Sequence, residues 1–431
     1  MEKKGKKLVY VLNKDGTPLM PCVPVIARLL IKENKARVVR RTPFTIKLRY
    51  RPKTEHVQPL TLGVDAGSVI VGIGVTNEEG DVYYAGEIEL RNDITGKMDK
   101  RRTYRRSRRT RNCRYRKCRF LNRKNSIKKE RFAPSVKSKI DAHLREINFV
   151  KQLLPINECL VEAGTFDPHA LQNPEVLNNP LLYQQGLKYG FNNAKAYVLH
   201  RDKYTCQHCR GRSKDKRLHC HHIVFKEHGG NDHPDNLIVF CRTCHDLLHE
   251  GKITLHIMGK KKGTLKHATQ MNAIRKQVLK RTVATETFGY ITKTHREALE
   301  LEKTHAIDAL IIASKGKTLI LKNDTIVLKK CVSKGDYQQT KGVRSHQRIP
   351  TGKIQGFRKF DKVKYEEGEY FIKGRMSAGY AVLMDIKGNK QDFNHIPKLS
   401  EMTRMSARTS QIITECSIHL APEGASFLEQ T

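Results

Sequence analysis

The chain has 431 residues, with 82 Lys or Arg against 43 Asp or Glu, which gives a formal net charge of +39. This length predicts about three domains, and so large an excess of positive charge indicates a polyanionic partner such as a nucleic acid. No apolar run approaches the roughly twenty residues that a membrane span needs, and the eleven cysteines, four of them in closely spaced pairs, favour a reducing compartment over a disulfide scaffold.

The first 55 residues are expected to form a small basic module of mixed α and β structure. Short apolar runs separated by turn residues predict strands, and a periodic apolar segment predicts one helix. The expected elements are strands at 8–12, 36–41 and 44–50, a turn at 13–16, a rigid Pro-Leu-Met-Pro connector at 18–21, and a helix at about 25–33.

Three consecutive strands are expected within residues 60–90, and the first of them ends in an acid, Asp65. A carboxylate at the end of a buried strand is costly unless it binds something. An RNase H-like fold presents its first metal-binding Asp in this way. An Asp-Gly turn at a strand end has the same local sequence, so both interpretations stay open here.

An arginine-rich segment follows. Residues 97–133 contain no Gly or Pro, and within 100–119 twelve of twenty residues are Lys or Arg. Such a run repels itself, but it becomes a good helix when one face contacts phosphates and releases counterions. We therefore expect a nucleic-acid-binding helix rather than a disordered tail. Its expected contact residues are Arg101, Arg102, Arg105, Arg106, Arg108, Arg109, Arg111, Arg114, Arg116 and Arg119.

A second acidic strand is predicted beyond this segment. An amphipathic helix at 136–154 precedes a short apolar strand at 158–164, near the far end of which lies Glu162. We take Glu162 as the second candidate acid. A linker rich in Asn and Pro, 167–180, then leads toward a segment dense in Cys and His.

Two Cys-x-x-Cys pairs, Cys206/Cys209 and Cys241/Cys244, bracket that segment. Structural zinc is held by four soft ligands that commonly come in such pairs. Coordination would also tie together a segment too short to bury much of a core by itself. The pairing predicts a structural zinc site, and the alternative is four unrelated free cysteines.

The residues between the pairs resemble the HNH, or ββα-metal, nuclease finger: a short strand ending in His221 and His222, a Gly-containing loop, Asn236 before a second strand, and a helix carrying His245. The resemblance implies that His222 is the general base, that His221 and His245 hold one Mg²⁺-like ion, and that Asn236 braces the loop. Because imidazole is a poorer Mg²⁺ ligand than the Asp that many members carry, we expect a preference for Mn²⁺.

The surplus histidines of this segment are more simply surface or packing residues. His249 is the exception, since it could replace a cysteine at the zinc. The others are His208, His219, His228 and His233.

Downstream, a strand is expected at 288–292, and a helix containing residues 305–313 follows. His305 and Asp308 are three residues apart and share one helix face, an arrangement that taken alone is more often a surface feature than a site. Residues 326–431 are predicted to be β-rich and barrel-like, with strands at 357–365, 369–375 and 380–386.

Asp65, Glu162 and the His305/Asp308 pair together resemble the three-part motif of RuvC nucleases. The finger lies between the second and third parts, and the arginine-rich segment lies between the first and second. With the Pro-Leu-Met-Pro module in front, this order resembles the IscB family of transposon-encoded RNA-guided nucleases over essentially the whole chain.

The resemblance implies an α/β multidomain fold. An RNase H-like (RuvC) domain is split by the arginine-rich bridge helix and by the inserted ββα-metal HNH domain with its zinc ribbon. The implied boundaries are an N-terminal module at 1–55, RuvC parts at 56–95, 133–185 and 261–325, the bridge helix at 96–132, the HNH domain at 186–260 and a β-rich C-terminal module at 326–431.

The resemblance also implies partners and a reaction. A long structured guide RNA pairs with one strand of double-stranded DNA, and base pairing reads the sequence, while the C-terminal module reads a short target-adjacent motif. The HNH site cuts the guide-paired strand. Asp65, Glu162 and Asp308 ligate Mg²⁺ or Mn²⁺ and cut the displaced strand with help from His305. We expect a monomeric protein in a cytoplasmic, nucleoid-associated ribonucleoprotein of a bacterial or archaeal cell, without membrane contact.

Two other functions account for part of the sequence. A protein-only HNH homing or restriction-type endonuclease would need no RNA, but it leaves the arginine run and the RuvC acids without a role. A non-enzymatic zinc-ribbon nucleic-acid binder would tolerate replacement of His222, Asp65, Glu162 and Asp308.

Overall fold

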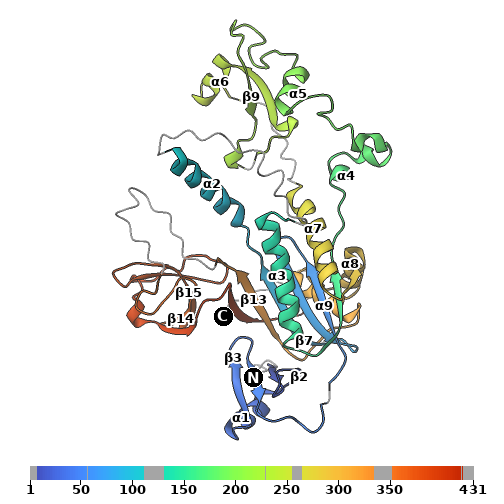
Figure 1. Cartoon of the computed structure of the whole chain (residues 1–431), viewed down its shortest axis with the longest axis vertical. Helices are drawn as coiled ribbons and strands as arrows, with labels where there is room; N and C mark the ends of the chain where they lie inside the picture. Colours follow the sequence, from blue (N-terminus) through green and yellow to red (C-terminus); the bar gives the residue numbers. More distant parts are fainter. Residues whose placement is uncertain are drawn as a thin grey trace. The chain divides into compact units, whose positions relative to one another are not determined.

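A computed structural model of the chain describes residues 7–55, 57–110, 131–228, 230–254, 265–333, 352–418 and 420. The chain divides into two compact units, a larger one of Met1–Thr165 with Gln270–Thr431 and a smaller one of Phe166–Thr269 (Figure 1). None of the described helices combines the length and the apolar composition that crossing a membrane requires.

The larger unit is built on an eight-stranded sheet. Its centre consists of the three strands expected from the sequence, β5 (Leu60–Ala66), β6 (Ile70–Asn77) and β7 (Asp81–Glu89), which pair as an antiparallel meander. On one side β8 (Ile156–Glu162) and β11 (Thr285–Thr287) continue the sheet in parallel with β5. On the other side lie the parallel β13 (Thr325–Cys331) and the antiparallel β18 (Gln411–Ser417), while β12 (Ile320–Leu321) pairs with β7.

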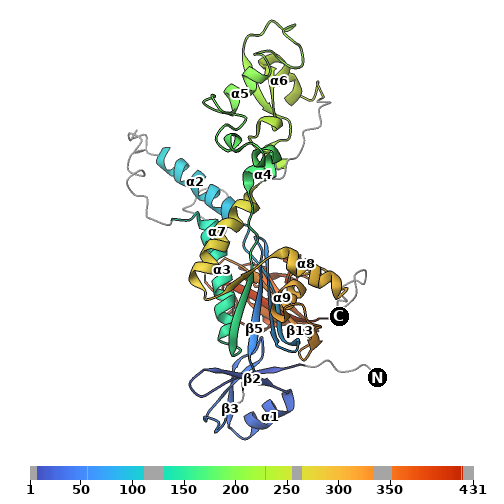
Figure 2. The same ribbon diagram turned by 90° about the vertical axis from the view of Figure 1, so that its right-hand side faces the viewer.

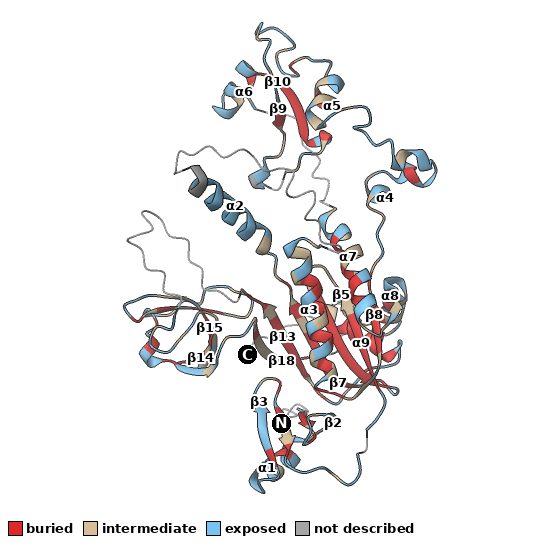
Figure 3. Ribbon diagram, in the orientation of Figure 1, coloured by how far each residue is buried: buried red, intermediate tan, exposed pale blue. Residues whose placement is uncertain are grey.

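Helices cover both faces of this sheet (Figure 2). Leu60, Leu62 and Val64 of β5 are fully buried in a core shared with α3 (Pro134–Lys151) and α7 (Lys266–Arg281). Because side chains alternate along a strand, Gly63 and Asp65 face the opposite side, where α9 (His305–Ser314) packs. Figure 3 shows the sheet and the inner helix faces as the buried part of the unit.

Glycines allow α9 to lie directly on the sheet. A Cβ atom at Gly72 would overlap the carbonyl oxygen of His305, and one at Gly63 would overlap that of Ala309. At Gly74, a Cβ atom would lie 2.7 Å from the backbone nitrogen of Leu310. The absence of side chains at these positions brings the first turn of α9 to the end of β5.

The prediction of a strand at 288–292 is wrong. β11 ends at Thr287, and α8 (Gly289–Ala298) begins two residues later. The local sequence is aromatic and β-branched, but the backbone N–H of Ile291 donates to Phe288 O at 3.0 Å, and the Thr292 hydroxyl donates to Glu162. This tertiary contact outweighs the strand propensity of the segment.

Two smaller sheets flank the large one within the same unit. The N-terminal sheet has the order β2-β1-β4-β3, formed by β1 (Val9–Leu12), β2 (Pro18–Cys22), β3 (Ala36–Arg40) and β4 (Thr45–Leu48), with α1 (Pro24–Lys32). The Pro-Leu-Met-Pro run, expected to be a connector, is therefore an edge strand, a sheet position where proline is tolerated.

The C-terminal module differs from its expected extent. Its antiparallel sheet has the order β16-β15-β14-β17, formed by β14 (Lys362–Tyr365), β15 (Gly368–Arg375), β16 (Ala381–Met384) and β17 (Thr403–Ser406). β13 and β18, which the sequence analysis placed in this module, belong to the large sheet instead, because β13 pairs with β7 and β18 pairs with β13.

The smaller unit contains a hairpin of β9 (Leu218–His222) and β10 (Leu237–Cys241), together with α5 (Ala194–Arg201) and α6 (Arg242–His249). The expected Asn- and Pro-rich linker is a series of single turns, α4 (Pro168–Gln172), η2 (Pro174–Leu177) and η3 (Pro180–Tyr183). Asp167, Asn173 and Asn179 precede these turns at intervals of six residues. Each side chain accepts a hydrogen bond from the backbone N–H two residues on, at 2.8, 3.2 and 3.2 Å.

Gly72→Ala should lower the free energy of unfolding by about 1–3 kcal/mol, because the added methyl meets rigid backbone. Gly96→Ala is the matched control, since a Cβ atom at Gly96 in α2 (Ile94–Thr110) would meet no atom within 4 Å beyond its chain neighbours and the backbone of its own helix. That change should be neutral or stabilising by up to about 1 kcal/mol. Chemical denaturation of the two variants compares them, and equal stabilities would refute the close packing of α9.

Candidate functional site

Two of the predicted acids lie next to each other on the large sheet. Asp65 on β5 and Glu162 on β8 are register partners in a parallel pair, so their side chains leave the same face near the ends of the two strands. Both side chains are partly buried. Long-range strand pairing thus brings together residues that are almost one hundred positions apart in the sequence.

The first turn of α9 brings His305 and Asp308 to the same place. His305 Nδ1 lies 2.5 Å from Asp65 Oδ2, and this hydrogen bond raises the pKa of His305. Thr304 caps the helix by accepting a hydrogen bond from the N–H of Ile307, and Glu87 on β7 accepts one from the N–H of Ala306 at 3.0 Å. The helix terminus is therefore anchored from two sides.

Burial, together with the charge of neighbouring carboxylates, raises the pKa of two carboxyl groups at this acidic site, Asp308 and Glu162. Burial raises the pKa of Asp308 to about 6, helped by the charge of Asp65 and opposed by Arg296, whose Nε lies 3.3 Å from Asp308 Oδ1. Burial also raises the pKa of Glu162, while the hydrogen bond from Thr292 lowers it. Partly buried carboxylates that repel one another fit a divalent cation, whose charge would offset both effects.

A second cluster lies in the smaller unit and consists of thiols. The Sγ atoms of Cys206, Cys209, Cys241 and Cys244 all lie within 4.8 Å of one another. Burial opposes ionisation of Cys209, yet hydrogen bonds, the strongest from Ser213, lower its pKa to about 5, whereas the pKa of Cys244 is raised by burial and by neighbouring thiols. Four thiols this close cannot all ionise without a compensating cation, and their geometry fits zinc.

A third cluster consists of imidazoles. Ring nitrogens of His221, His245 and His249 lie within 4.8 Å of one another, and the ring centroids of His245 and His249 are 4.5 Å apart. His221 is buried, and its Nε2 has no hydrogen-bond partner among the described residues. Burial and the other two rings lower the pKa of His221 to about 4, so at neutral pH it is in the form that ligates metals.

His249 corrects an expectation from the sequence. It does not belong to the cysteine cluster. α6 places it one turn after His245, where its ring nitrogen lies within 4.8 Å of those of His221 and His245. The spacing of four residues between His245 and His249 on a helix is the sequence signal that would have found it.

The other residues that the sequence analysis compared with the HNH finger, His222 and Asn236, lie near this third cluster. His222 points to the other face of β9 from His221, and its Nε2 lies 2.8 Å from Asp232 Oδ1. Lys226 also binds Asp232, with Nζ 3.0 Å from Oδ2. The Asn236 side chain accepts a hydrogen bond from the N–H of Val224 at 2.8 Å and donates to its carbonyl oxygen at 3.0 Å, which fastens the loop after β9 to β10.

The arginine-rich segment forms α2 as far as the structure describes it. No residue of α2 whose side chain is described is buried, and Arg101, Arg102, Arg105 and Arg106 are exposed. A helix whose side chains are exposed on all sides fits a surface that binds a polyanion. The other predicted contacts lie outside the described side chains: Arg108, Arg109, Arg111, Arg114, Arg116 and Arg119.

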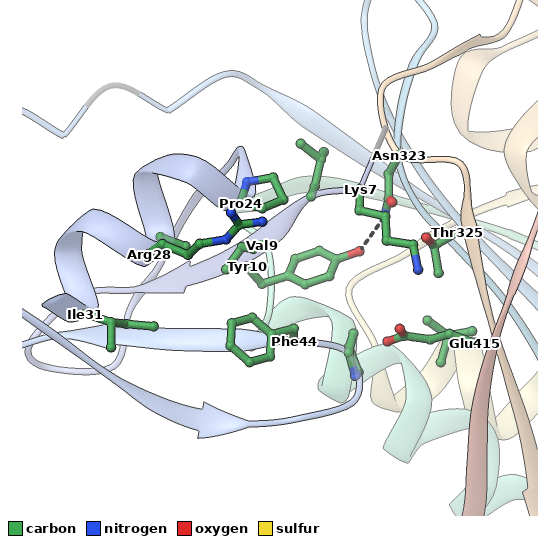
Figure 4. A pocket seen from close by; sticks show the side chains of 14 residues that line it. Lys7, Val9, Tyr10, Pro24, Arg28, Ile31, Phe44, Asn323, Thr325 and Glu415 are labelled. Atoms are coloured by element: carbon green, nitrogen blue, oxygen red, sulfur yellow. Dashed lines mark hydrogen bonds between the residues drawn. The ribbon is translucent and has the colours of Figure 1, made fainter. Parts of the chain in front are cut away.

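A cavity of about 280 Å³ lies between the N-terminal module and the large sheet (Figure 4). Tyr10, Phe44, Asn323 and Glu415 are among its lining residues, and Asn323 Nδ2 donates to Tyr10 Oη at 3.2 Å. It contains none of the predicted site residues, so we assign the chemistry to the side-chain clusters rather than to this cavity.

Sequence reasoning missed the residues that support these clusters. Glu87, Thr292 and Arg296 contact the acidic site from β7 and α8, and Asp232 contacts His222 from a loop. None of them belongs to a spaced motif. They enter through long-range pairing or loop geometry, for which a single sequence carries no signal.

Removal of metal should unfold the smaller unit selectively. Cys209→Ser and chelator treatment should each increase protease cleavage and hydrogen exchange within Phe166–Thr269, while protection of the large sheet stays unchanged. Cys220→Ser is the matched control, because Cys220 lies in β9 outside the four-thiol cluster. If the smaller unit of the Cys209→Ser and Cys220→Ser variants is equally resistant to protease and to hydrogen exchange, with and without metal, no structural metal stabilises this unit.

Two sequence families match the chain. The family described as RRXRR protein matches residues 9–186, and the HNH endonuclease family matches residues 206–251. No curated protein matches the chain. The solved structures it resembles include one described as the crystal structure of Streptococcus thermophilus Cas9 in complex with the AGAA PAM, at 11% sequence identity and a TM-score of 0.33. That similarity covers 62% of this chain and only 34% of the Cas9 chain.

The HNH match spans all four clustered cysteines and all three clustered histidines, and the RRXRR match spans Asp65, Glu162 and α2. Residues 206–251 therefore form an HNH endonuclease domain, and in combination with the RRXRR region they fit an IscB-like RuvC/HNH nuclease.

Proposed function

We propose that the chain is an RNA-guided DNA endonuclease with two active sites that cut opposite strands. The observation that carries this proposal is that one chain holds two chemically different groups of potential cation ligands. One is the carboxylate site on the large sheet, and the other is the imidazole cluster inside the HNH domain. A single-site nuclease would need only one of them.

The carboxylate site is proposed to cut the displaced strand as a RuvC-type site. The antiparallel meander that continues into parallel strands, with acids near the ends of neighbouring strands, supports an RNase H-like fold for this part. Asp65, Glu162 and Asp308 would hold Mg²⁺ or Mn²⁺, which when bound activates water and stabilises the leaving oxygen. With Nδ1–H of His305 donated to Asp65, Nε2 is the nitrogen that exchanges a proton with the reacting groups.

The HNH site is proposed to cut the guide-paired strand. With Nε2–H of His222 donated to Asp232, Nδ1 takes the proton from the attacking water, and the Asp232 carboxylate stabilises the imidazolium that forms. His221, His245 and His249 would hold one ion. Three imidazoles without a carboxylate favour Mn²⁺ or another transition ion over Mg²⁺. The four cysteines would hold zinc, which holds the fold of the domain.

Guidance by RNA is supported by the charge of the chain and by α2. A net charge of +39 and exposed arginines along a helix within the RRXRR region suit a long RNA backbone. Sequence would then be read by pairing between the guide and the target strand. A protein-only HNH nuclease would leave both the acidic site and the arginine helix unused.

The complex purified with its own RNA should cut each DNA strand with a different site. His222→Ala should slow cutting of the guide-paired strand by at least about 100-fold, the scale of general base catalysis, and leave the other strand within about threefold. Asp65→Ala should show the reverse pattern. Strand-specific end labels on a target duplex measure both rates, and His228→Ala, which replaces an exposed histidine of the HNH domain, is the control.

Two results would contradict the proposal. If RNA washes off in high salt as a heterogeneous mixture, the protein-only HNH nuclease becomes the better explanation. If either single substitution abolishes both cuts while nucleic-acid binding persists, the assignment of one strand to each site is wrong.

Cutting at the carboxylate site should depend on pH below about 6. Asp308 binds a cation only as the carboxylate, and its pKa in the metal-free protein is raised to about 6. At subsaturating metal, the Asp65-dependent rate should therefore fall by up to about tenfold for each pH unit below 6. Saturating metal should move the midpoint to lower pH, since cation and proton compete. A midpoint independent of metal concentration would contradict this competition.

A further inference from the structure

Two aromatic side chains stand exposed just after β11. Phe288 is 49% exposed and Tyr290 is 70% exposed. Their ring centroids are 6.0 Å apart, and the ring planes are within 16° of each other. Neither ring belongs to a hydrophobic core cluster of the described residues. Burial in the described fold therefore does not explain this parallel pair.

The pair lies beside the carboxylate site. β11 runs parallel to β8 with Thr287 opposite Glu162, so the chain leaves the sheet at that carboxylate. Gly289, between the two aromatic residues, is so near that a Cβ atom there would lie 2.7 Å from Glu162 Oε1. Thr292, on the same turn of α8, donates its hydroxyl hydrogen to Glu162. The backbone that carries the rings therefore touches a proposed metal ligand.

The charge around the pair suits a nucleic-acid strand. Lys293 and Thr294, the next exposed residues of α8, are polar, and Lys293 also pairs with Glu297 on the same helix at 3.6 Å. Lys303 is close enough to Glu162 and Asp308 to lower the pKa of both. An aromatic pair followed by polar and basic residues is not the broad apolar patch of a protein interface. It matches the combination of rings and cations that holds single strands.

We propose that Phe288 and Tyr290 form a stacking site for an unpaired base of the DNA strand whose phosphodiester enters the carboxylate site. This inference rests on the proposed function and adds a substrate preference to it. Aromatic rings stack on any base through its flat face, and only an unpaired strand offers that face. The pair therefore positions single-stranded DNA for cutting and disfavours intact duplex at this site.

The test uses the complete ribonucleoprotein and a target duplex labelled on each strand. Phe288→Ala/Tyr290→Ala should slow cutting of the displaced strand by about 5- to 150-fold, the range of a lost base stack, and leave the guide-paired strand unchanged. Phe288→Tyr/Tyr290→Phe keeps both rings and should retain the rate. Val283→Ala, which removes an apolar side chain that is 95% exposed, is the control for loss of exposed surface.

Single abasic sites in the displaced strand identify the stacked base. At one position near the mapped cut, removal of the base should slow the unsubstituted complex by the same factor as removal of the rings. The two changes together should slow it no further, because they remove one interaction. In the metal-free complex with chelator present, 2-aminopurine at that position should be quenched, and the double alanine variant should relieve the quenching.

Three results overturn the stacking site. They are an unchanged rate in the double alanine variant, equal slowing of both strands, and full additivity of ring removal with every abasic site. Failure of the proposed function would look different, since the unsubstituted complex would then show no Asp65-dependent cut at all, and the stacking site would lose its basis.

Discussion

The contact between α9 and the glycines of β5 and β6 is the constraint on which the carboxylate site depends. Glu162 and Asp65 come from paired strands, but His305 and Asp308 reach them only because the helix backbone lies against the sheet. A layer of side chains between helix and sheet would hold the helix several ångströms further out, as in ordinary packing. Because α9 lies this close to the sheet, His305 reaches Asp65 on β5 and forms a hydrogen bond with it.

Burial acts in opposite ways at two of the candidate metal sites, the carboxylate site and the imidazole cluster. In the carboxylate site, burial raises the pKa of Asp308 and Glu162 and so disfavours the charged form that a cation needs. In the imidazole cluster, burial lowers the pKa of His221 and favours the neutral form that a metal needs. Competition with protons near neutral pH is therefore expected at the first site and not at His221. The donor atoms also differ, so the two sites should prefer different ions.

Nucleic acid would be held by two different physical means. The exposed arginines of α2 would bind the phosphate backbone through charge alone, and such binding is sensitive to salt. The uncharged rings of Phe288 and Tyr290 would stack on the flat face of a base, and such stacking does not depend on which base it is. Neither contact would read sequence, and the proposed reading of the target by a guide RNA requires no such contact.

Sequence alone determined the features that depend on local spacing. The cysteine pairs, the His221-His222 dipeptide and the face shared by His305 and Asp308 follow from the geometry of one turn or one strand. The three strands of the meander were likewise readable from short apolar runs between turn residues. These features depend only on neighbouring residues, so the tertiary structure leaves them unchanged.

Tertiary structure decided everything that depends on which distant segments pair. It assigned β13 and β18 to the large sheet and made residues 289–298 a helix, although local propensity favours a strand at 288–292. It placed His249 with His221, and it brought Glu87 and Asp232 to sites that no motif connects them with. The physical reason is that strand register and helix packing are fixed by burial of the whole core, whereas a motif reports only the few residues around it.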